Sequence, residues 1–177
     1  GRQSVILHTL SRVRTIWKTL VSQIDILETM TPLSFLSFRD RLESSSGFQS
    51  LQFREVECLL GKRSPRLLGP YKQDSVEWKK LKGRMNKPNI YEAFLNYLND
   101  SGYTLAESIL RERLEKPTPR AEVEAVLKGI YREQAGFGQV CERLVDLDEG
   151  VQEWRYRHVK MVERTIGNKI GTGGSSG

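Results

Sequence analysis

The sequence has few cysteines, few histidines and no long apolar run. Cys58 and Cys141 are isolated, without a Cys-x-x-Cys pair or a disulfide framework, so a reducing cytoplasmic location is expected. His8 and His158 are too few for an ordinary zinc site with three or four protein ligands, although one histidine can hold a metal inside a macrocycle. The apolar runs are far too short to cross a bilayer, so no membrane partner is expected.

The length and charge are those of a globular domain. The 177 residues suit one domain over 1–177 with a real core. The net charge of +6 comes from 28 basic and 22 acidic residues that are scattered among one another. No basic run is interleaved with aromatic residues, so no nucleic-acid partner is expected. The chain begins Gly-Arg-Gln without a signal-peptide layout, so we expect an internal piece or a chain that has lost its ends.

Apolar residues recur every three or four positions and nowhere show sustained period-two alternation. This pattern predicts an all-α fold, a bundle with long amphipathic helices. Thr31 and Pro32 are a typical helix start, and Ser46-x-x-Gln49 reads as a capping box. The expected helices cover 6–27, 32–42, 47–60, 76–85, 90–98, 105–114, 123–131 and 137–167, with a loop over 62–74 and a connector over 116–119. The first of them carries a predicted apolar seam that comprises Ile6, Leu10, Val13, Trp17, Leu20, Ile24 and Leu27.

One histidine lies in the apolar stripe of the last helix. The stripe comprises Phe137, Val140, Leu144, Leu147, Val151, Trp154, His158, Met161 and Thr165. An imidazole at position 158 points where a leucine would be expected. Two interpretations stay open: a core histidine with a hydrogen-bonding neighbour, or the ligand of a large apolar group such as a haem.

Two other residues each have a structural and a functional interpretation. Arg39 follows Phe35 and Phe38, and it can either pair with Glu43 one turn later or bind a carboxylate through both guanidinium nitrogens. Ser46 can be a helix cap or line a site. The glycine- and serine-rich segment 171–177 can be a linker, a flexible terminus or a backbone loop around an anion, and it matches neither common phosphate-binding glycine pattern.

Five short blocks in register resemble the tryptophan 2,3-dioxygenase family across essentially the whole chain. They are Leu27-Glu-Thr-Met-Thr-Pro32, Phe38-Arg39, Ser46-Gly-Phe-Gln-Ser-Leu-Gln-Phe-Arg54, Trp154-Arg-Tyr-Arg-His158 and Gly171-Thr-Gly-Gly-Ser-Ser-Gly177. The Ser-Gly-Phe-Gln-Ser and Gly-Thr-Gly-Gly-Ser-Ser-Gly blocks are specific, and the match identifies the glycine-rich segment as native sequence. The resemblance implies an all-helical, cytoplasmic homotetramer, a dimer of dimers, that binds haem b through its iron.

The resemblance also implies an activity and roles for particular residues. The family opens the indole 2,3-bond of L-tryptophan with O2 and forms N-formyl-L-kynurenine, the first step of tryptophan catabolism by the kynurenine pathway. His158 matches the axial haem ligand, and Ser46 and Trp154 fall in the haem pocket. Arg39 matches the residue that binds the substrate carboxylate, and Thr172 the one that meets the substrate ammonium group. Phe35 stands where some members carry a carboxylate-binding tyrosine, so it is expected only to wall the pocket.

The family's distal histidine lies on a segment that this sequence does not contain, so no catalytic residue is assigned here. We expect the chain to lack that N-terminal segment and the helices after the glycine loop, and to be incomplete as a catalyst. Two other functions stay open from sequence. One is a haem enzyme of the same superfamily with other oxygen chemistry on an aromatic amino acid. The other is a non-catalytic basic helical bundle.

Overall fold

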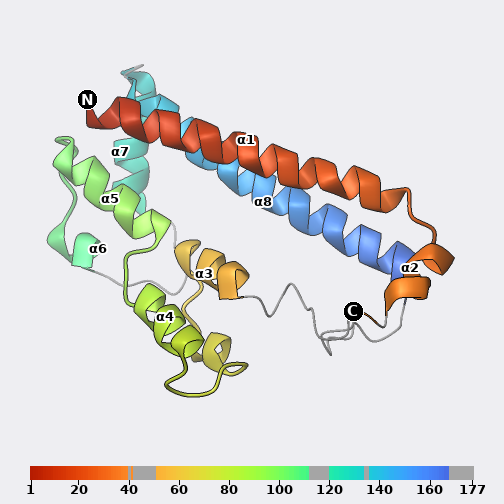
Figure 1. Ribbon diagram of the computed structural model, residues 1–177. Helices are drawn as coiled ribbons and strands as arrows, with labels where there is room; N and C mark the ends of the chain where they lie inside the picture. Colours follow the sequence, from red (N-terminus) through yellow and green to blue (C-terminus); the bar gives the residue numbers. More distant parts are fainter. Residues whose placement is uncertain (40, 42–50, 112–119, 134–135, 168–177) are drawn as a thin grey trace. The chain divides into compact units, whose positions relative to one another are not determined.

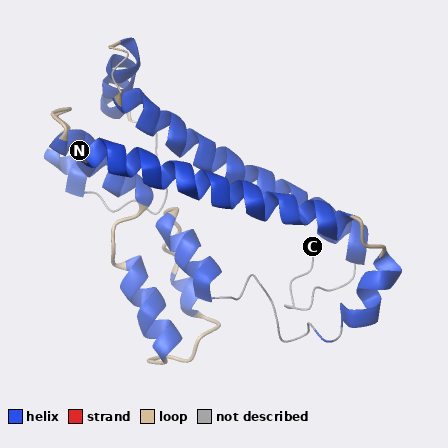
Figure 2. Ribbon diagram, turned by 45° about the horizontal axis from the view of Figure 1, so that its top comes forward, coloured by secondary structure: helices blue, strands red, loops and turns tan. Residues whose placement is uncertain are grey.

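The computed structural model describes residues 1–39, 41, 51–111, 120–133 and 136–167, and these are helical with short connections (Figures 1 and 2). Its elements are α1 (Arg2–Glu28), α2 (Pro32–Arg39), α3 (Leu51–Leu59), the 3-10 helix η3 (Pro65–Leu68), α4 (Val76–Met85), α5 (Ile90–Asp100), α6 (Glu107–Arg111), α7 (Ala121–Arg132) and α8 (Phe137–Ile166). The described residues contain no strand, which confirms the all-α prediction. None of these helices is both long and apolar enough to span a bilayer.

The chain divides into two compact units. The first comprises Gly1–Ser45 with Gly129–Gly177, and the second comprises Ser46–Lys128. The first unit therefore joins the two ends of the sequence, and it contains α1, α2 and α8. The single domain over 1–177 stays a prediction.

The first unit is built on α1 and α8, which lie side by side and run in the same direction (Figure 1). The residue numbers of the paired side chains increase together along both helices: Arg14 pairs with Asp146, and Asp25 pairs with Arg157. All nine stripe residues of α8 are buried or half-buried, as the periodicity predicts. In α1 the buried residues are Val21 and Ile24, whereas Leu20 is 46% exposed. The predicted seam was wrong at Leu20 and at Leu27, which is 41% exposed, because contact with α8 selects the face that carries residues 21 and 24.

Helix α2 follows α1 and packs against α8 (Figure 1). Its start agrees with the sequence pattern: Pro32 is the first helical residue, and the backbone N–H of Ser34 donates to the Thr31 hydroxyl at 3.1 Å. The described part of the helix runs to Arg39, and the predicted extension to residue 42 falls on positions that are mostly outside the described residues. Residues 40 and 42–50, including the predicted capping box at Ser46, lie outside the described part of the chain.

The second unit has a small core where α3, η3 and α4 meet. The buried side chains there are Cys58, Leu67 and Leu81, and the residues packed around them are Leu51, Leu68, Tyr71 and Met85. Helix α3 stops at Gly61 as predicted: Gly61 has φ of 106°, and the Lys62 N–H donates to the Glu57 carbonyl at 2.9 Å. The predicted loop 62–74 contains η3, which was missed because its cap, Ser64, and Pro65 signal only one short turn.

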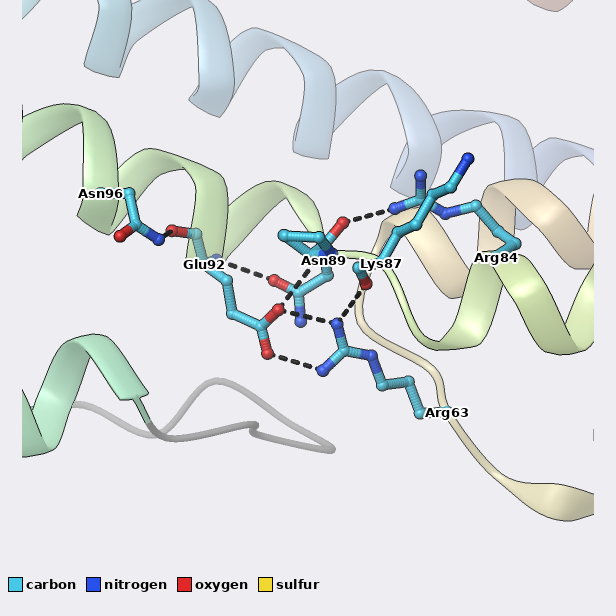
Figure 3. A network of polar contacts seen from close by, with 7 residues as sticks. Arg63, Arg84, Lys87, Asn89, Glu92 and Asn96 are labelled. Atoms are coloured by element: carbon cyan, nitrogen blue, oxygen red, sulfur yellow. Dashed lines mark hydrogen bonds and ion pairs between the residues drawn. The ribbon is translucent and has the colours of Figure 1, made fainter.

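A buried ion pair ties the loop before η3 to the start of α5 (Figure 3). Arg63 donates to both carboxylate oxygens of Glu92 at 2.6 and 2.7 Å and to the Lys87 carbonyl at 2.7 Å. Glu92 also completes a capping box, since it accepts from the Asn89 N–H at 3.0 Å while its own N–H donates to the Asn89 side chain at 2.8 Å. Hydrogen bonding to Glu92 raises the pKa of Arg63, against the opposing effect of burial. One carboxylate therefore starts a helix and fixes the preceding loop.

Candidate functional site

The imidazole of His158 lies on the seam between α1 and α8, in a row of three rings. The ring of Trp154, one turn earlier on α8, stacks on it with centroids 5.2 Å apart and planes inclined by 22°. The indole of Trp17, from α1, lies 6.3 Å from the Trp154 ring at 58°. Both α8 rings are half-buried. The histidine is thus presented from an aromatic surface that two helices build together.

Burial also sets the charge of this histidine. Partial removal from water lowers the pKa of His158 below its usual value, because a protonated imidazole loses more hydration than a neutral one. At neutral pH the ring is therefore uncharged and keeps a nitrogen lone pair. That is the form of histidine that binds a metal.

This pKa shift predicts that stability falls in mild acid. The unfolded chain takes up a proton on residue 158 as the pH drops below about 6.5, whereas the folded chain resists protonation until lower pH. The contribution is therefore fully present above that pH and is lost below it. Thermal unfolding of the apo chain between pH 5 and 7.5 should show a smaller pH dependence for His158→Leu than for wild type. Equal slopes for the two proteins would contradict the shifted pKa.

Gly150 lets the two helices approach at this row of rings. A Cβ atom added there would lie 2.3 Å from Cδ1 and 2.9 Å from Nε1 of Trp17, closer than any real Cβ contact. The indole Nε1 of Trp17 is itself buried, with no acceptor among the described residues. Trp17 belongs to the predicted apolar seam of α1, whereas no role was predicted for Gly150. A glycine inside a long helical pattern is the signal that could have found it.

Arg157, the residue before His158 on α8, binds two carboxylates near the C-terminal end of α1. Its Nη2 donates to the carboxylate of Asp25 and, at 3.0 Å, to that of Glu28. The hydrogen bond to Asp25, and next in size the one to Glu28, raise the pKa of Arg157. Since α1 ends at Glu28 and α2 begins at Pro32, this contact holds the turn that leads into α2. Sequence reasoning missed it, because 132 residues separate Arg157 from Asp25.

Of the residues predicted to bind substrate, Phe35 and Arg39 lie on α2. Both are half-buried, and their four-residue spacing places them on one side of the helix. Because α2 packs against α8, they belong to the same compact unit as His158. Ser46 and Thr172, as well as Glu43, lie outside the described residues, so their predicted roles stay predictions.

Metal-binding side chains do not cluster elsewhere in the described chain. No group of three or more His, Cys, Asp or Glu residues is arranged there to hold an ion. Cys58 and Cys141 are both buried free thiols, and burial raises the pKa of each. Within the described residues, the protein is thus all-helical and carries a neutral, half-buried imidazole where its two longest helices, α1 and α8, pack together.

Comparison with known proteins gives the family. The tryptophan 2,3-dioxygenase family model matches residues 2–101 and 103–177. The tryptophan 2,3-dioxygenase of Anaeromyxobacter dehalogenans is 50% identical over all 177 residues, which cover 67% of that protein. That of Herpetosiphon aurantiacus is 49% identical over 171 residues, covering 96% of this chain and 65% of the relative. The chain belongs to the tryptophan 2,3-dioxygenase family, as the five sequence blocks predicted, and it spans about two thirds of the length of these relatives.

Proposed function

We propose that this chain carries the haem-binding site of a tryptophan 2,3-dioxygenase and the residues that bind the carboxylate of its substrate. The enzyme inserts O2 across the indole 2,3-bond of L-tryptophan and gives N-formyl-L-kynurenine, the first step of the kynurenine pathway. Membership of the family supports the reaction. The observation that carries the assignment to this part of the protein is the neutral, half-buried imidazole of His158 on its aromatic seam.

The donor set fits haem b. Haem requires one strong axial ligand from an apolar wall, and His158 offers a neutral ring beside Trp154 and Met161, both half-buried. The pocket would be completed by Ser46. The haem iron supplies the oxygen chemistry when it is bound, and the protein supplies binding, orientation and exclusion of water. His158 would hold the iron through its neutral imidazole nitrogen.

The substrate's amino-acid end would be held by α2 and the glycine-rich segment. Arg39 presents a planar guanidinium that can bind a carboxylate through two parallel hydrogen bonds. Phe35, one turn earlier, would wall the pocket without donating a hydrogen bond. Thr172 would meet the ammonium group. Holding both groups of the amino acid fixes the indole in one orientation, which can be worth about 7–11 kcal/mol of barrier at the extreme.

The substrate grip predicts a selective effect of Arg39→Ala. In the full-length enzyme, the variant should weaken tryptophan binding by about 1.5–3 kcal/mol, the range for hydrogen bonds to charged groups, while haem loading is unchanged. Titration of the haem spectrum with tryptophan measures both. Arg39→Lys should recover only part of the affinity, since an ammonium cannot form the two-pronged contact.

Two controls define this test. Arg41, an exposed arginine two residues away, should tolerate alanine without loss of tryptophan affinity. Indole-3-propanamide lacks the carboxylate and the amine, so it should hardly distinguish wild type from Arg39→Ala. A fall in haem loading with unchanged tryptophan affinity would make Arg39 a structural residue.

The full-length protein is proposed to assemble as a homotetramer. Its proposed location is the reducing cytoplasm. Helices α1 and α8 expose large apolar side chains, and exposed apolar surface favours association: Val5 is 66%, Ile26 is 64% and Tyr156 is 66% exposed. The two free thiols agree with a reducing compartment. Light scattering decides the assembly, and a monomer over a wide range of concentration would contradict it.

A further inference from the structure

We propose that Trp17, seated against Gly150, is a positioning residue that sets the orientation of the His158 imidazole through the ring of Trp154. The orientation of the imidazole is a property of the apo chain. Its consequence for haem rests on the function proposed above.

The first step is the stack on the histidine itself. Trp154 and His158 are one turn apart on α8, so their side chains lie on the same face. Their planes are inclined by only 22° at a centroid distance of 5.2 Å, an offset stack of the kind that aromatic rings favour. A rotation of the imidazole about its own side-chain bonds would break this contact. The face of Trp154 therefore selects one plane for the imidazole.

The second step is the support behind Trp154. Its ring meets the indole of Trp17 at a tilt of 58°, with the two centroids 6.3 Å apart across the two helices. Because Trp17 belongs to α1, it blocks Trp154 from a direction that α8 cannot supply. The His158 orientation thus depends on a residue of another helix, far away in sequence.

The third step is the notch that holds Trp17. Position 150 lies one turn before Trp154, and a Cβ there would overlap the indole of Trp17 at 2.3 Å. Glycine inside a helix is less stable than alanine, so the close approach explains a residue that the helix by itself disfavours. Gly138, in the same helix, has no atom within 4 Å of an added Cβ. The steric requirement is therefore specific to position 150.

These three contacts form one path from the backbone of α8 to its histidine. Groups that surround a metal ligand orient it, and their loss changes the bond to the metal even when the ligand remains. Here the orienting groups are two indole rings and a glycine. In the haem-loaded protein they would hold the imidazole of His158 in one orientation.

The primary test uses the apo chain and needs no haem. Protons above the face of an indole resonate upfield, so the imidazole protons of His158 report directly on the stack with Trp154. The other histidine, His8, is exposed on α1 and serves as reference in the same spectrum. In Gly150→Ala and in Trp17→Leu, the His158 signals should lose their upfield displacement and move towards those of His8. Gly138→Ala should leave them in place.

The second readout is the ferrous iron–histidine stretching band of the haem-loaded full-length protein. It should shift or broaden in Gly150→Ala and Trp17→Leu, and stay at the wild-type position in Gly138→Ala. Trp17→Phe keeps a ring in the seam and should fall between wild type and Trp17→Leu. It also supplies the measurement if Gly150→Ala does not fold.

The outcomes separate this inference from the proposed function. His158 proton signals that coincide with wild type in both Gly150→Ala and Trp17→Leu would overturn the positioning role. A changed thermal midpoint together with those wild-type signals would make Trp17 a packing residue only. If haem does not bind through His158, the stretching band is absent from wild type as well, and the apo spectra still decide whether Trp17 positions the ring.

Discussion

Replacing His158 with alanine should abolish the spectrum of bound haem or convert it to that of weakly held haem. The substitution removes the neutral imidazole from the aromatic seam and leaves no other histidine on α8. The Soret and visible bands of the full-length protein, recorded in the ferric and ferrous states, measure the effect. N-formyl-L-kynurenine formation from tryptophan and O2 should be lost with the haem.

The matched control for this experiment is His8→Ala. His8 is the only other histidine of the sequence, and it is exposed on α1, so its removal should leave the haem spectrum unchanged. Imidazole added to the His158→Ala protein should restore part of the axial-ligand spectrum. An unchanged ferrous spectrum in His158→Ala would refute the assignment of this residue as the ligand.

Removing the carboxylate of Glu92 should destabilise the second unit by about 3–5 kcal/mol, the range for breaking a buried ion pair from one side. The side chains of Arg63 and Glu92 are only 9% and 10% exposed, so Glu92→Ala leaves a guanidinium in a poorly hydrated place (Figure 3). It also removes the acceptor of the Asn89 N–H at the start of α5. Chemical denaturation followed by circular dichroism measures the loss.

Two further variants locate the origin of that loss. Glu92→Gln keeps the size and an acceptor oxygen but not the charge, so it should cost less than alanine. Glu124→Ala breaks the exposed pair with Lys128, and such surface pairs contribute about 0–1 kcal/mol. Equal effects of Glu92→Ala and Glu124→Ala would show that the Arg63 contact does not stabilise the fold.

The helices and the family were determined by the sequence alone. The period of the apolar residues and local caps predicted helices over 76–85 and 137–167, and the structure has α4 at Val76–Met85 and α8 at Phe137–Ile166. Such signals are local, because a helix closes its hydrogen bonds four residues away and its caps act within one turn. The stripe that contains His158 was likewise visible, because one helical face repeats every three to four residues. Five short blocks then gave the family, which the comparisons confirmed.

Which helix faces pack against one another was decided only by the tertiary structure. The sequence did not reveal that α1 and α8 run parallel, that Trp17 lies on Gly150, or that Arg157 joins the carboxylates at the end of α1. It likewise missed the pairing of Arg63 with Glu92, 29 residues away. These contacts join residues whose separation in sequence has no fixed period. Their selection depends on which faces meet when the helices pack, and one residue of rotation was enough to bury Val21 and expose Leu20.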